Sequence, residues 1–420
     1  MIPTVITANN EYYGALRGYY VPETQYYNII PYDAHIDDNR IRNIGVILPT
    51  NPFKETGLED AIANGDYAKS DRKGAQALIK RSSQAEITPD TWSEFLLKIH
   101  SAVPDIDLCD CLIGYRDEGE LHLVQCFCTP DCQPVITRVK VEPYSLKLDL
   151  FSRNTGILES DIMLHKRAMF IGCGSVGSLV AVELAKAGVG HFMLVDNDIF
   201  GYHNICRHQC GIYDVGRYKT DALADRILQI NPYAQIEKYN LAIQDVDRDD
   251  FMKFCNEDTI IVGGADNREG DLYACNLGIK AGAAFVSIGC WERAFAGEIF
   301  YCLPSGTPTY SDFLEVTGYV SGRVTQNRRF YTSEEDLEKV SFEPGISADV
   351  NFVTIVGVKL ILDLLNRDNA GYTQRLLPHL TQYTLVCNTN NTAIGGEQAE
   401  IFSYPLQVTT SIEVPYANEQ

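Results

Sequence analysis

Ile171-Gly172-Cys173-Gly174-Ser175-Val176-Gly177 is the stretch that decides the fold of this chain. An apolar run at 168–171 precedes it and a helical pattern at 176–187 follows, so the glycines join a strand to a helix. Glycines allow a tight turn and a close approach of the backbone, and the free N–H groups of the helix start suit phosphate oxygens. The motif predicts a nucleotide site, but alone it does not separate a dinucleotide from ATP.

The polar residues that follow the turn favour ATP with magnesium over NAD. In chain order they are Asp196, Asp198, Asn204, Arg207, Lys219 and Asp266. Asp196 ends the expected strand 192–195, where a carboxylate can accept hydrogen bonds from ribose hydroxyls. A triphosphate needs several cationic and amide donors, which a dehydrogenase does not need. Asp266 follows the expected strand 259–263, at the end of the sheet where a carboxylate can hold magnesium.

Strands and helices alternate through this half of the sequence. Strands are expected at 168–171, 192–195, 236–240, 259–263, 285–290 and 298–302. Helices are expected at 176–187, 219–229, 270–281 and 350–365. Such alternation predicts the α/β class with a doubly wound, Rossmann-like sheet. We also expect a lead-in helix over 150–170 and a polar loop over 304–345 that crosses the domain.

The sequence predicts three parts. Residues 1–149 form an additional N-terminal α+β domain, residues 150–370 form the nucleotide-binding domain, and residues 371–420 form a strand-rich tail that packs on it. In the first part, Thr88 and Pro89 open an expected helix. No motif in this N-terminal domain indicates a specific activity, so partner binding or dimerisation is the role we expect for it.

Four cysteines of the N-terminal domain are expected to pair across a hairpin. They are Cys109, Cys111, Cys126 and Cys128. A two-residue turn at Glu118-Gly119 places Cys111 opposite Cys126 and Cys109 opposite Cys128, and alternation puts all four on one face. Two interpretations stay open. One is structural zinc, for which thiolates are preferred ligands, and the other is a buried face that uses cysteine as a small apolar residue.

Composition excludes several classes of function. The 420 residues carry a formal net charge of −21, so a broad basic surface for nucleic acid is not expected. The longest apolar run, 350–365, contains Asn351 and Lys359, so a buried helix is expected there and no membrane span. The start of the chain lacks the pattern of an export signal, and thirteen cysteines without such a signal indicate reduced thiols in the cytoplasm.

Together these motifs resemble the ThiF/MoeB/HesA family, which has the adenylation fold of ubiquitin-activating enzymes. The resemblance covers about residues 150–300 and continues more weakly to about residue 368. The family pattern is an arginine in a lead-in segment, G-x-G-x-x-G, D-x-D, N-x-x-R, a lysine and D-N. This chain contains Arg153, Gly172/Gly174/Gly177, Asp196-Asn197-Asp198, Asn204-Ile205-Cys206-Arg207, Lys219 and Asp266-Asn267.

The resemblance implies a reaction. Members adenylate a carboxylate with ATP, typically the C-terminal glycine of a ubiquitin-like protein, and release pyrophosphate. It also implies a homodimer, a ubiquitin-conjugating-enzyme-like acceptor and, in bacterial conjugation systems, a role in antiviral defence. The residue roles carried over are ribose binding by Asp196, phosphate binding by Asn204, Arg207 and Lys219, magnesium binding by Asp266, and phosphate contact from the neighbouring subunit by Arg153.

The chain departs from the family pattern in its cysteines. Many members carry paired C-x-x-C zinc ligands after the sixth strand, where this chain has no cysteine at 308–313, so zinc is not expected in this domain. Thioester-forming members place a nucleophilic cysteine in the crossing loop or before the return helix, but none lies between Cys302 and Cys387. Cys290 and Cys387 are the remaining candidates for a thioester, and the alternative for each is a buried strand cysteine.

Four interpretations of the function remain. The first is adenylation of the C-terminal carboxylate of a ubiquitin-like protein. The second keeps the site but acts on a peptide, a sulfur-carrier protein or a small carboxylic acid. The third is a nucleotide-binding scaffold without catalysis, which the intact set of Asp196, Arg207, Lys219 and Asp266 disfavours. The fourth is an NAD-dependent dehydrogenase.

Overall fold

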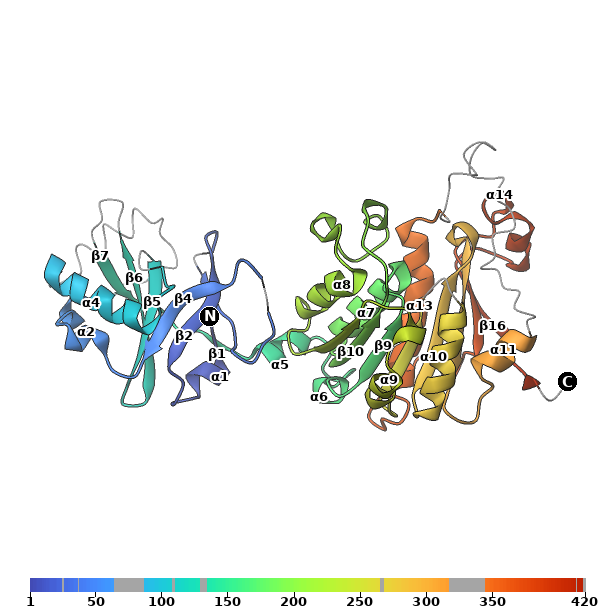
Figure 1. The fold of residues 1–420 in the computed structure, drawn as a ribbon, viewed down its shortest axis with the longest axis horizontal. Coiled ribbons are helices and arrows are strands. Elements are labelled where there is room, and N and C mark those ends of the chain that lie inside the picture. Colours follow the sequence, from blue (N-terminus) through green and yellow to red (C-terminus); the bar gives the residue numbers. More distant parts are fainter. Residues whose placement is uncertain are drawn as a thin grey trace. The chain divides into compact units, whose positions relative to one another are not determined.

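The chain divides into two compact units, which are coloured along the sequence in Figure 1. They are Met1–Leu150 and Phe151–Gln420. The structure, a computed structural model, describes residues 1–24, 26–36, 38–63, 87–107, 110–128, 134–264, 268–316, 344–412 and 414–417. Each unit has hydrophobic clusters of its own, as an independently folding domain requires.

The N-terminal unit is α+β, with a six-stranded sheet in the order β3-β2-β4-β5-β6-β7. Helices α2 and α4 cover one face, where Phe53 and Phe95 are buried. The other face buries Ile2 and Ile6, which come from β1 and α1. The bounds in chain order are β1 Ile2–Pro3, α1 Thr4–Thr7, β2 Gly14–Val21, β3 Tyr26–Ile29, β4 Arg42–Leu48, α2 Pro52–Glu55, η1 Glu59–Ala61, α4 Pro89–Ala102, β5 Asp110–Asp117, β6 Glu120–Cys128, β7 Pro134–Arg138 and β8 Pro143–Tyr144.

The hairpin of β5 and β6 has the register that the sequence predicts. Asp117 pairs with Glu120 across a two-residue turn. The turn residues Glu118 and Gly119 have φ angles of 49° and 87°. Positive φ at both central residues matches the right-handed twist of paired strands, which is why such turns favour glycine.

Cys111 lies opposite Cys126 in this hairpin, as predicted, and both are buried in the core under α4. Burial raises the pKa of Cys126 well above its ordinary value, and the nearby Cys111 and Cys128 add to the effect. Cys109 lies outside the described residues, and the described part of the chain contains no cluster of three potential metal ligands. The burial of Cys111 and Cys126 fits the buried-face interpretation, and zinc binding by the four cysteines stays a prediction.

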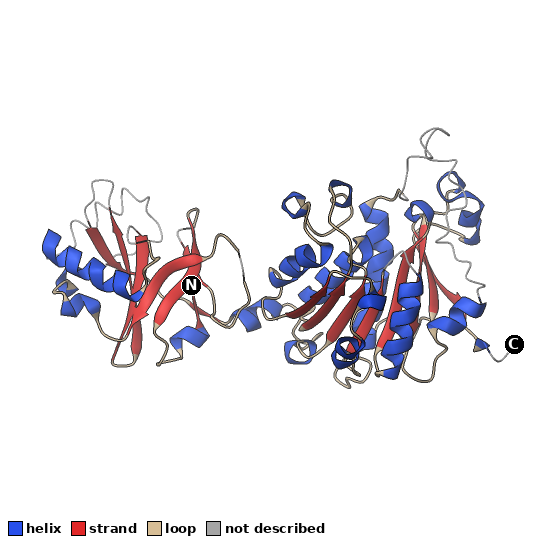
Figure 2. Cartoon of the chain, viewed as in Figure 1, coloured by secondary structure: helices blue, strands red, loops and turns tan. Residues whose placement is uncertain are grey.

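The C-terminal unit is built on an eight-stranded sheet in the order β11-β10-β9-β12-β13-β14-β15-β16. The first five strands in this order are parallel and the last three are antiparallel. Their bounds are β9 Arg167–Ile171, β10 His191–Val195, β11 Gln235–Tyr239, β12 Thr259–Gly263, β13 Ala284–Cys290, β14 Ala296–Cys302, β15 Tyr383–Cys387 and β16 Gln407–Ile412. Helices lie on both faces (Figure 2), so the predicted doubly wound α/β class is confirmed.

Two layers of helices form the cores of this unit. One core packs α7, α8 and α13 on the sheet, and the other packs α9, α10 and α11 on its opposite face. The helix bounds are α5 Leu146–Phe151, α6 Ser160–Met163, α7 Ser175–Lys186, α8 Lys219–Leu228, α9 Arg248–Phe254, α10 Arg268–Lys280, α11 Tyr310–Val316, α13 Ser347–Leu365 and α14 Thr392–Gly395. Short 3-10 turns are η2 Tyr202–Asn204, η3 Ile212–Asp214, η4 Ile243–Asp245, η5 Glu292–Ala294 and η7 Gly396–Ile401. Among the described helices, none combines the length and apolarity that a bilayer crossing requires.

The lead-in segment 150–170 is not a single helix, so this expectation is wrong. It contains the end of α5, the short α6 and the beginning of β9. Gly156 lies between the two helices with a φ of 83°, a left-handed conformation that a helix interior excludes. Arg167, expected at the end of the helix, instead begins β9.

The stretch 304–345, expected to be a loop, contains the helix α11. The Thr309 hydroxyl accepts the N–H of Asp312 at 3.2 Å, and the Asp312 carboxylate accepts the N–H of Thr309 at 2.7 Å. These reciprocal bonds form a capping box, and they explain why a helix starts here. Tyr310 and Phe313 of this helix are buried against the sheet. Residues 317–343 lie outside the described part, so the rest of the crossing loop stays a prediction.

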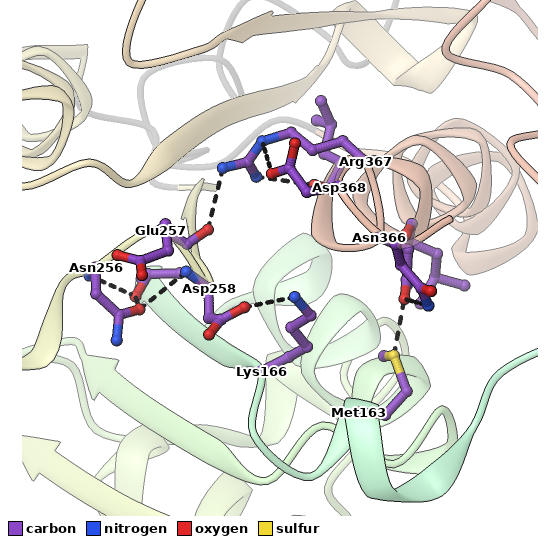
Figure 3. A network of polar contacts seen from close by, with 12 residues as sticks. Met163, Lys166, Asn256, Glu257, Asp258, Asn366, Arg367 and Asp368 are labelled. Carbon is purple, nitrogen blue, oxygen red and sulfur yellow. Dashed lines mark hydrogen bonds and ion pairs between the residues drawn. The ribbon is translucent and has the colours of Figure 1, made fainter. Parts of the chain in front are cut away.

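At the amino edge of the sheet, where the parallel strands begin, polar contacts connect segments that are distant in sequence (Figure 3). Lys166 Nζ lies 2.5 Å from Asp258 Oδ1, which joins the segments before β9 and β12. Arg367, just beyond α13, donates to the carbonyl of Glu257 at 3.0 Å. The first contact thus connects the segments that precede two neighbouring strands, and the second connects the end of α13 to the segment before β12.

Asp363, near the end of α13, is fully buried and organises the segment that follows. Its Oδ2 accepts the N–H groups of Arg375, Leu376 and Leu377 at 2.8, 2.6 and 2.9 Å. Its Oδ1 accepts the hydroxyl of Tyr372 at 2.7 Å. Four donors compensate the lost hydration of the carboxylate, which explains how a charge is tolerated in this core.

Candidate functional site

A cavity of about 400 Å³ opens at the carboxyl edge of the parallel strands. Its wall consists of Ile171, Gly172, Gly174, Val195, Asp196, Asn197, Asp198, Lys219, Leu241, Ala242, Ile243, Gln244, Gly264 and Gly270. These residues end or follow β9, β10, β11 and β12, and the strand order reverses between β9 and β12. Open α/β sheets bind their ligands at that reversal. The volume is typical of small-molecule sites, which span roughly 300–1,000 Å³.

The glycine turn borders this cavity, and two of its three glycines are required by the local backbone geometry. Gly172 has a φ of 94°, which strongly favours glycine. A Cβ on Gly177 would lie 2.1 Å from the carbonyl oxygen of Gly172, so the helix can approach the turn only without a side chain there. Gly174 caps α7 and has open space where a Cβ would be. The helix start is therefore accessible to a ligand, as the motif predicts.

Asp196 is held in the cavity wall by two backbone groups. Its Oδ2 accepts the N–H of Cys173 at 2.7 Å, and its Oδ1 accepts the N–H of Asp198 at 2.8 Å. These bonds join the end of β10 to the glycine turn and fix the orientation of the carboxylate. The sequence prediction put Asp196 beside the turn, and the structure brings the two together.

Lys219 forms an ion pair with Asp198, and both residues belong to the cavity wall. Its Nζ lies 2.6 Å from Asp198 Oδ2. The Lys219 side chain is 11% exposed, whereas that of Asp198 is 64% exposed, so the ammonium is mostly removed from water. A cation in such a site interacts more strongly with an anionic ligand than it would in bulk water. Lys219 is also the first residue of α8, and its N–H donates to the Asp198 carbonyl at 3.0 Å.

Asn204 and Arg207 lie in the loop that connects Asp198 to Lys219. The side-chain oxygen of Asn204 accepts the N–H of Gly201 at 2.8 Å. The backbone carbonyl of Asn204 accepts the N–H of Arg207 at 3.0 Å. Arg207 is half-buried. In the part of the chain that the structure describes, neither residue lines the cavity. The structure thus places both in a compact turn beside the cavity, with the Asn204 side chain shaping that turn.

His208, which sequence reasoning missed, follows Arg207 and is buried. Its Nε2 lies 2.7 Å from the carbonyl oxygen of Cys173, so the loop contacts the glycine turn directly. Burial lowers the pKa of His208 to about 4, and the nearby Lys219 ammonium acts in the same direction. The available signal was its position directly after the N-x-x-R motif.

Two predicted site residues are not brought to this cavity by the described part of the chain. Arg153 is exposed and lies beside Asn154, whose side chain donates to the carbonyl of Lys186 at 2.9 Å. Lys186 ends α7, which extends about 18 Å from the glycine turn at 1.5 Å per residue over its 12 residues. Asp266 lies outside the described residues, although the preceding Gly264 is in the cavity wall.

The two candidate thioester cysteines also lie outside the cavity wall. Cys387 is fully buried in β15, and burial raises its pKa. A buried, protonated thiol is a poor nucleophile. Cys290 ends β13 and is half-buried.

Glu298, a buried carboxylate in β14, lies outside the cavity wall. Its Oε2 accepts the indole N–H of Trp291 at 3.1 Å and the hydroxyl of Tyr383 at 2.9 Å. Its Oε1 lies 3.5 Å from a guanidinium nitrogen of Arg268, the first residue of α10. Glu298 therefore joins three neighbouring elements, a role that depends on strand pairing and was not visible in the sequence.

Comparison with known proteins points to one family. The model of the ThiF family matches residues 149–391, which is more than half of the chain. Ubiquitin-like modifier-activating enzyme 5 of Bombyx mori is 31% identical over 189 residues, 41% of this chain and 46% of the relative. The probable adenylyltransferase/sulfurtransferase MoeZ of Mycobacterium tuberculosis is 28% identical over 152 residues, 36% of this chain and 38% of the relative.

Other similarities are shorter or more distant. The ATP-dependent ubiquitin transferase-like protein Cap2 of Escherichia coli is 38% identical over 82 residues, 19% of this chain and 14% of the relative. The chain spans less than half the length of the first curated relatives that it matches. The crystal structure of E. coli MccB with ATP aligns at a TM-score of 0.44 with 18% identity, covering 62% of this chain and 67% of that chain.

Proposed function

This chain belongs to the ThiF family, and from that premise we propose that its C-terminal unit is an adenylyltransferase that activates a carboxylate with ATP. In this reaction a carboxylate oxygen attacks the α-phosphorus of ATP and forms a new P–O bond. The bond between the α-phosphorus and the bridging oxygen breaks, and pyrophosphate leaves with that electron pair. The products are an acyl-adenylate and pyrophosphate.

The observation that carries the proposal is the composition of the cavity wall. It combines the helix start at Gly174 with the carboxylate of Asp196 and the mostly buried ammonium of Lys219. Helix N–H groups and a desolvated cation suit phosphate oxygens, and the carboxylate suits ribose hydroxyls. Nucleotidyl transfer requires chiefly positioning and charge stabilisation, which such a wall can supply.

The roles of the remaining residues are part of the proposal. Lys219 leaves its pair with Asp198 to bind the phosphates, and Asn204 and Arg207 supply further donors from the adjacent turn. Asp266 would hold Mg²⁺, which would neutralise charge on the phosphates. One or two carboxylates suffice for an ion that is also held by phosphates.

We propose that the activated carboxylate is the C-terminal glycine of a ubiquitin-like protein. The support is the similarity to an enzyme named for activating ubiquitin-like modifiers and to one named a ubiquitin transferase-like protein. The similarity to MoeZ makes a sulfur-carrier protein the second candidate substrate.

The test is ATP–pyrophosphate exchange by the full chain. Labelled pyrophosphate should enter ATP only when a suitable carboxylate is added, and tail peptides ending in glycine should support exchange better than the same peptides with an amidated C-terminus. Asp266→Ala should abolish exchange if this residue holds magnesium. Exchange without any carboxylate dependence, or exchange unchanged in Asp266→Ala, would contradict the respective assignment.

We further propose that Arg153 serves the cavity of a second copy of the chain. Its place beside the far end of α7 supports this, because about 18 Å of helix exceeds the reach of a side chain within one subunit. The test mixes two inactive variants, Arg153→Ala and Lys219→Ala. Mixed dimers would contain one intact site, so about a quarter of the sites should regain activity. No recovery in a mixture shown to exchange subunits would contradict the proposal.

For onward transfer, we propose direct delivery of the acyl group to an acceptor such as a ubiquitin-conjugating-enzyme-like protein. The burial of Cys387 supports this, because a thioester there would need the strand to open. Mass spectrometry after incubation with ATP and a ubiquitin-like protein separates the alternatives. An adduct on Cys290 or Cys387 that is lost on reduction would reveal a thioester, whereas direct delivery predicts an acyl-adenylate without such an adduct.

A further inference from the structure

The buried His208 uses both ring nitrogens in contacts between the loop and the glycine turn. Its Nδ1 accepts the backbone N–H of Cys210 at 3.0 Å, and its Nε2 lies 2.7 Å from the carbonyl oxygen of Cys173. The ring also makes an edge contact with buried Phe200, with 4.9 Å between ring centroids. Only 8% of the His208 surface is exposed, so water does not compete for these bonds.

The two contacts determine the protonation of the ring. A backbone N–H can only donate, so Nδ1 carries no proton and the proton of the neutral ring is on Nε2. Nε2–H therefore donates to the Cys173 carbonyl. Burial lowers the pKa of His208 to about 4, so the ring keeps this neutral form at neutral pH.

Cys173 is thus held through both of its backbone groups. Its N–H donates to Asp196 at 2.7 Å, and its carbonyl accepts from His208 at 2.7 Å. In a trans peptide the carbonyl and the next N–H point in opposite directions, and the described chain contains no cis peptide. The His208 contact therefore directs the Gly174 N–H away from His208, at the helix start that borders the cavity.

We propose that His208 is a positioning residue for the nucleotide, because it orients the Cys173–Gly174 peptide whose N–H donates a hydrogen bond to a phosphate oxygen. The same anchor positions the N-x-x-R turn, since the N–H groups of Arg207 and His208 both donate to the Asn204 carbonyl, at 3.0 and 2.9 Å. The inference rests on the proposed ATP site, and it adds a residue outside the cavity wall.

Three variants test this role. His208→Phe keeps an aromatic ring against Phe200 but removes both nitrogens. His208→Gln restores an amide donor toward Cys173. The matched control is Asn231→Leu, since Asn231 is also fully buried and donates to a backbone carbonyl, that of Val189 at 2.9 Å, at the amino edge of the sheet.

Calorimetric titration with ATP gives the primary readout, and exchange kinetics give the second. We expect His208→Phe to weaken ATP affinity by about tenfold and to raise KM more than it lowers kcat. His208→Gln should recover most of the affinity, and Asn231→Leu should bind ATP normally although it unfolds at lower temperature. If His208→Phe does not fold, His208→Asn replaces it. The Asn side chain is too short to reach the Cys173 carbonyl, so we expect the same loss of ATP affinity.

The outcomes separate this inference from the proposed function. Normal ATP affinity in His208→Phe would overturn the inference, as would an equal loss of affinity in His208→Phe and Asn231→Leu. Failure of the unaltered chain to bind ATP would instead overturn the proposed function.

Discussion

At the amino edge of the large sheet, Lys166 is paired with Asp258, and at the carboxyl edge Lys219 is paired with Asp198. The two pairs are chemically alike, with N–O distances of 2.5 and 2.6 Å and lysine side chains that are 13% and 11% exposed. The amino-edge pair joins segments that precede β9 and β12. The carboxyl-edge pair lines a cavity beside the helix start at Gly174. Two ion pairs of the same geometry can thus have different surroundings, and among the described residues only the carboxyl-edge pair adjoins a cavity where a ligand can reach it. The proposed difference in function therefore depends on the cavity and cannot be inferred from the ion pair itself.

The largest expected effect comes from removing the cation at the carboxyl edge. Lys219→Ala should lower the rate of ATP–pyrophosphate exchange by about 10²–10³-fold, because one preorganised donor to the phosphates is lost. Thermal unfolding should change little, because the partner Asp198 is 64% exposed and regains water.

The matched control for this prediction is Lys166→Ala at the amino edge. It removes a lysine of the same burial and ion pairing, so exchange should stay at the level of the unaltered chain. Equal losses of exchange in the two variants would remove the distinction between the edges.

The next effect is a loss of stability at the amino edge. Asp363→Ala should lower the free energy of unfolding by about 3 kcal/mol, because three buried N–H groups and the Tyr372 hydroxyl lose their acceptor. Chemical denaturation measures this value. ATP affinity should remain normal in the folded variant. The control is Asp368→Ala, whose side chain is 83% exposed and whose stability should be unchanged.

The smallest expected effect is a pH dependence at the carboxyl edge. The pKa of His208 is about 4 in the folded chain, below the ordinary value of about 6.5 in the unfolded chain. Between these values the unfolded chain binds more protons, so the His208 contribution is complete above pH 6.5 and is lost as the pH falls. From pH 6.5 to 5 the loss is about 2 kcal/mol.

Denaturation curves of the unaltered chain and of His208→Phe at several pH values measure this effect. The difference in stability between them should shrink as the pH falls from 6.5 to 5. A constant difference would show that the ring does not stay neutral in the folded chain.

The sequence predicted the glycine turn, the parallel strands and the α/β class, because each follows from local patterns of glycines and apolar residues. The turn residues Gly172 and Gly177 are constrained by contacts within six positions of each other, so a short motif records them fully. Asp196 was found because it ends a strand next to that turn. These features depend on residues that are close in sequence or in neighbouring strands. They are therefore visible in the sequence as a fixed glycine spacing and as apolar runs.

The features that were missed depend on contacts between distant segments. His208 binds a carbonyl 35 positions earlier, and Glu298 binds Tyr383 85 positions later. No periodic pattern marks such partners. The single lead-in helix was a wrong expectation because Gly156 turns the chain, and α11 was missed because its capping box was not recognised at Thr309. The roles of Arg153 and Asp266 remain predictions.

The most direct test of the central claim is a competition between ATP and NAD for the cavity at the carboxyl edge. The measurement is calorimetric titration of the full chain with each nucleotide in the presence of magnesium. We expect ATP to bind to one site per chain and NAD not to displace it. Tighter binding of NAD than of ATP would contradict the claim that this cavity is built for a triphosphate.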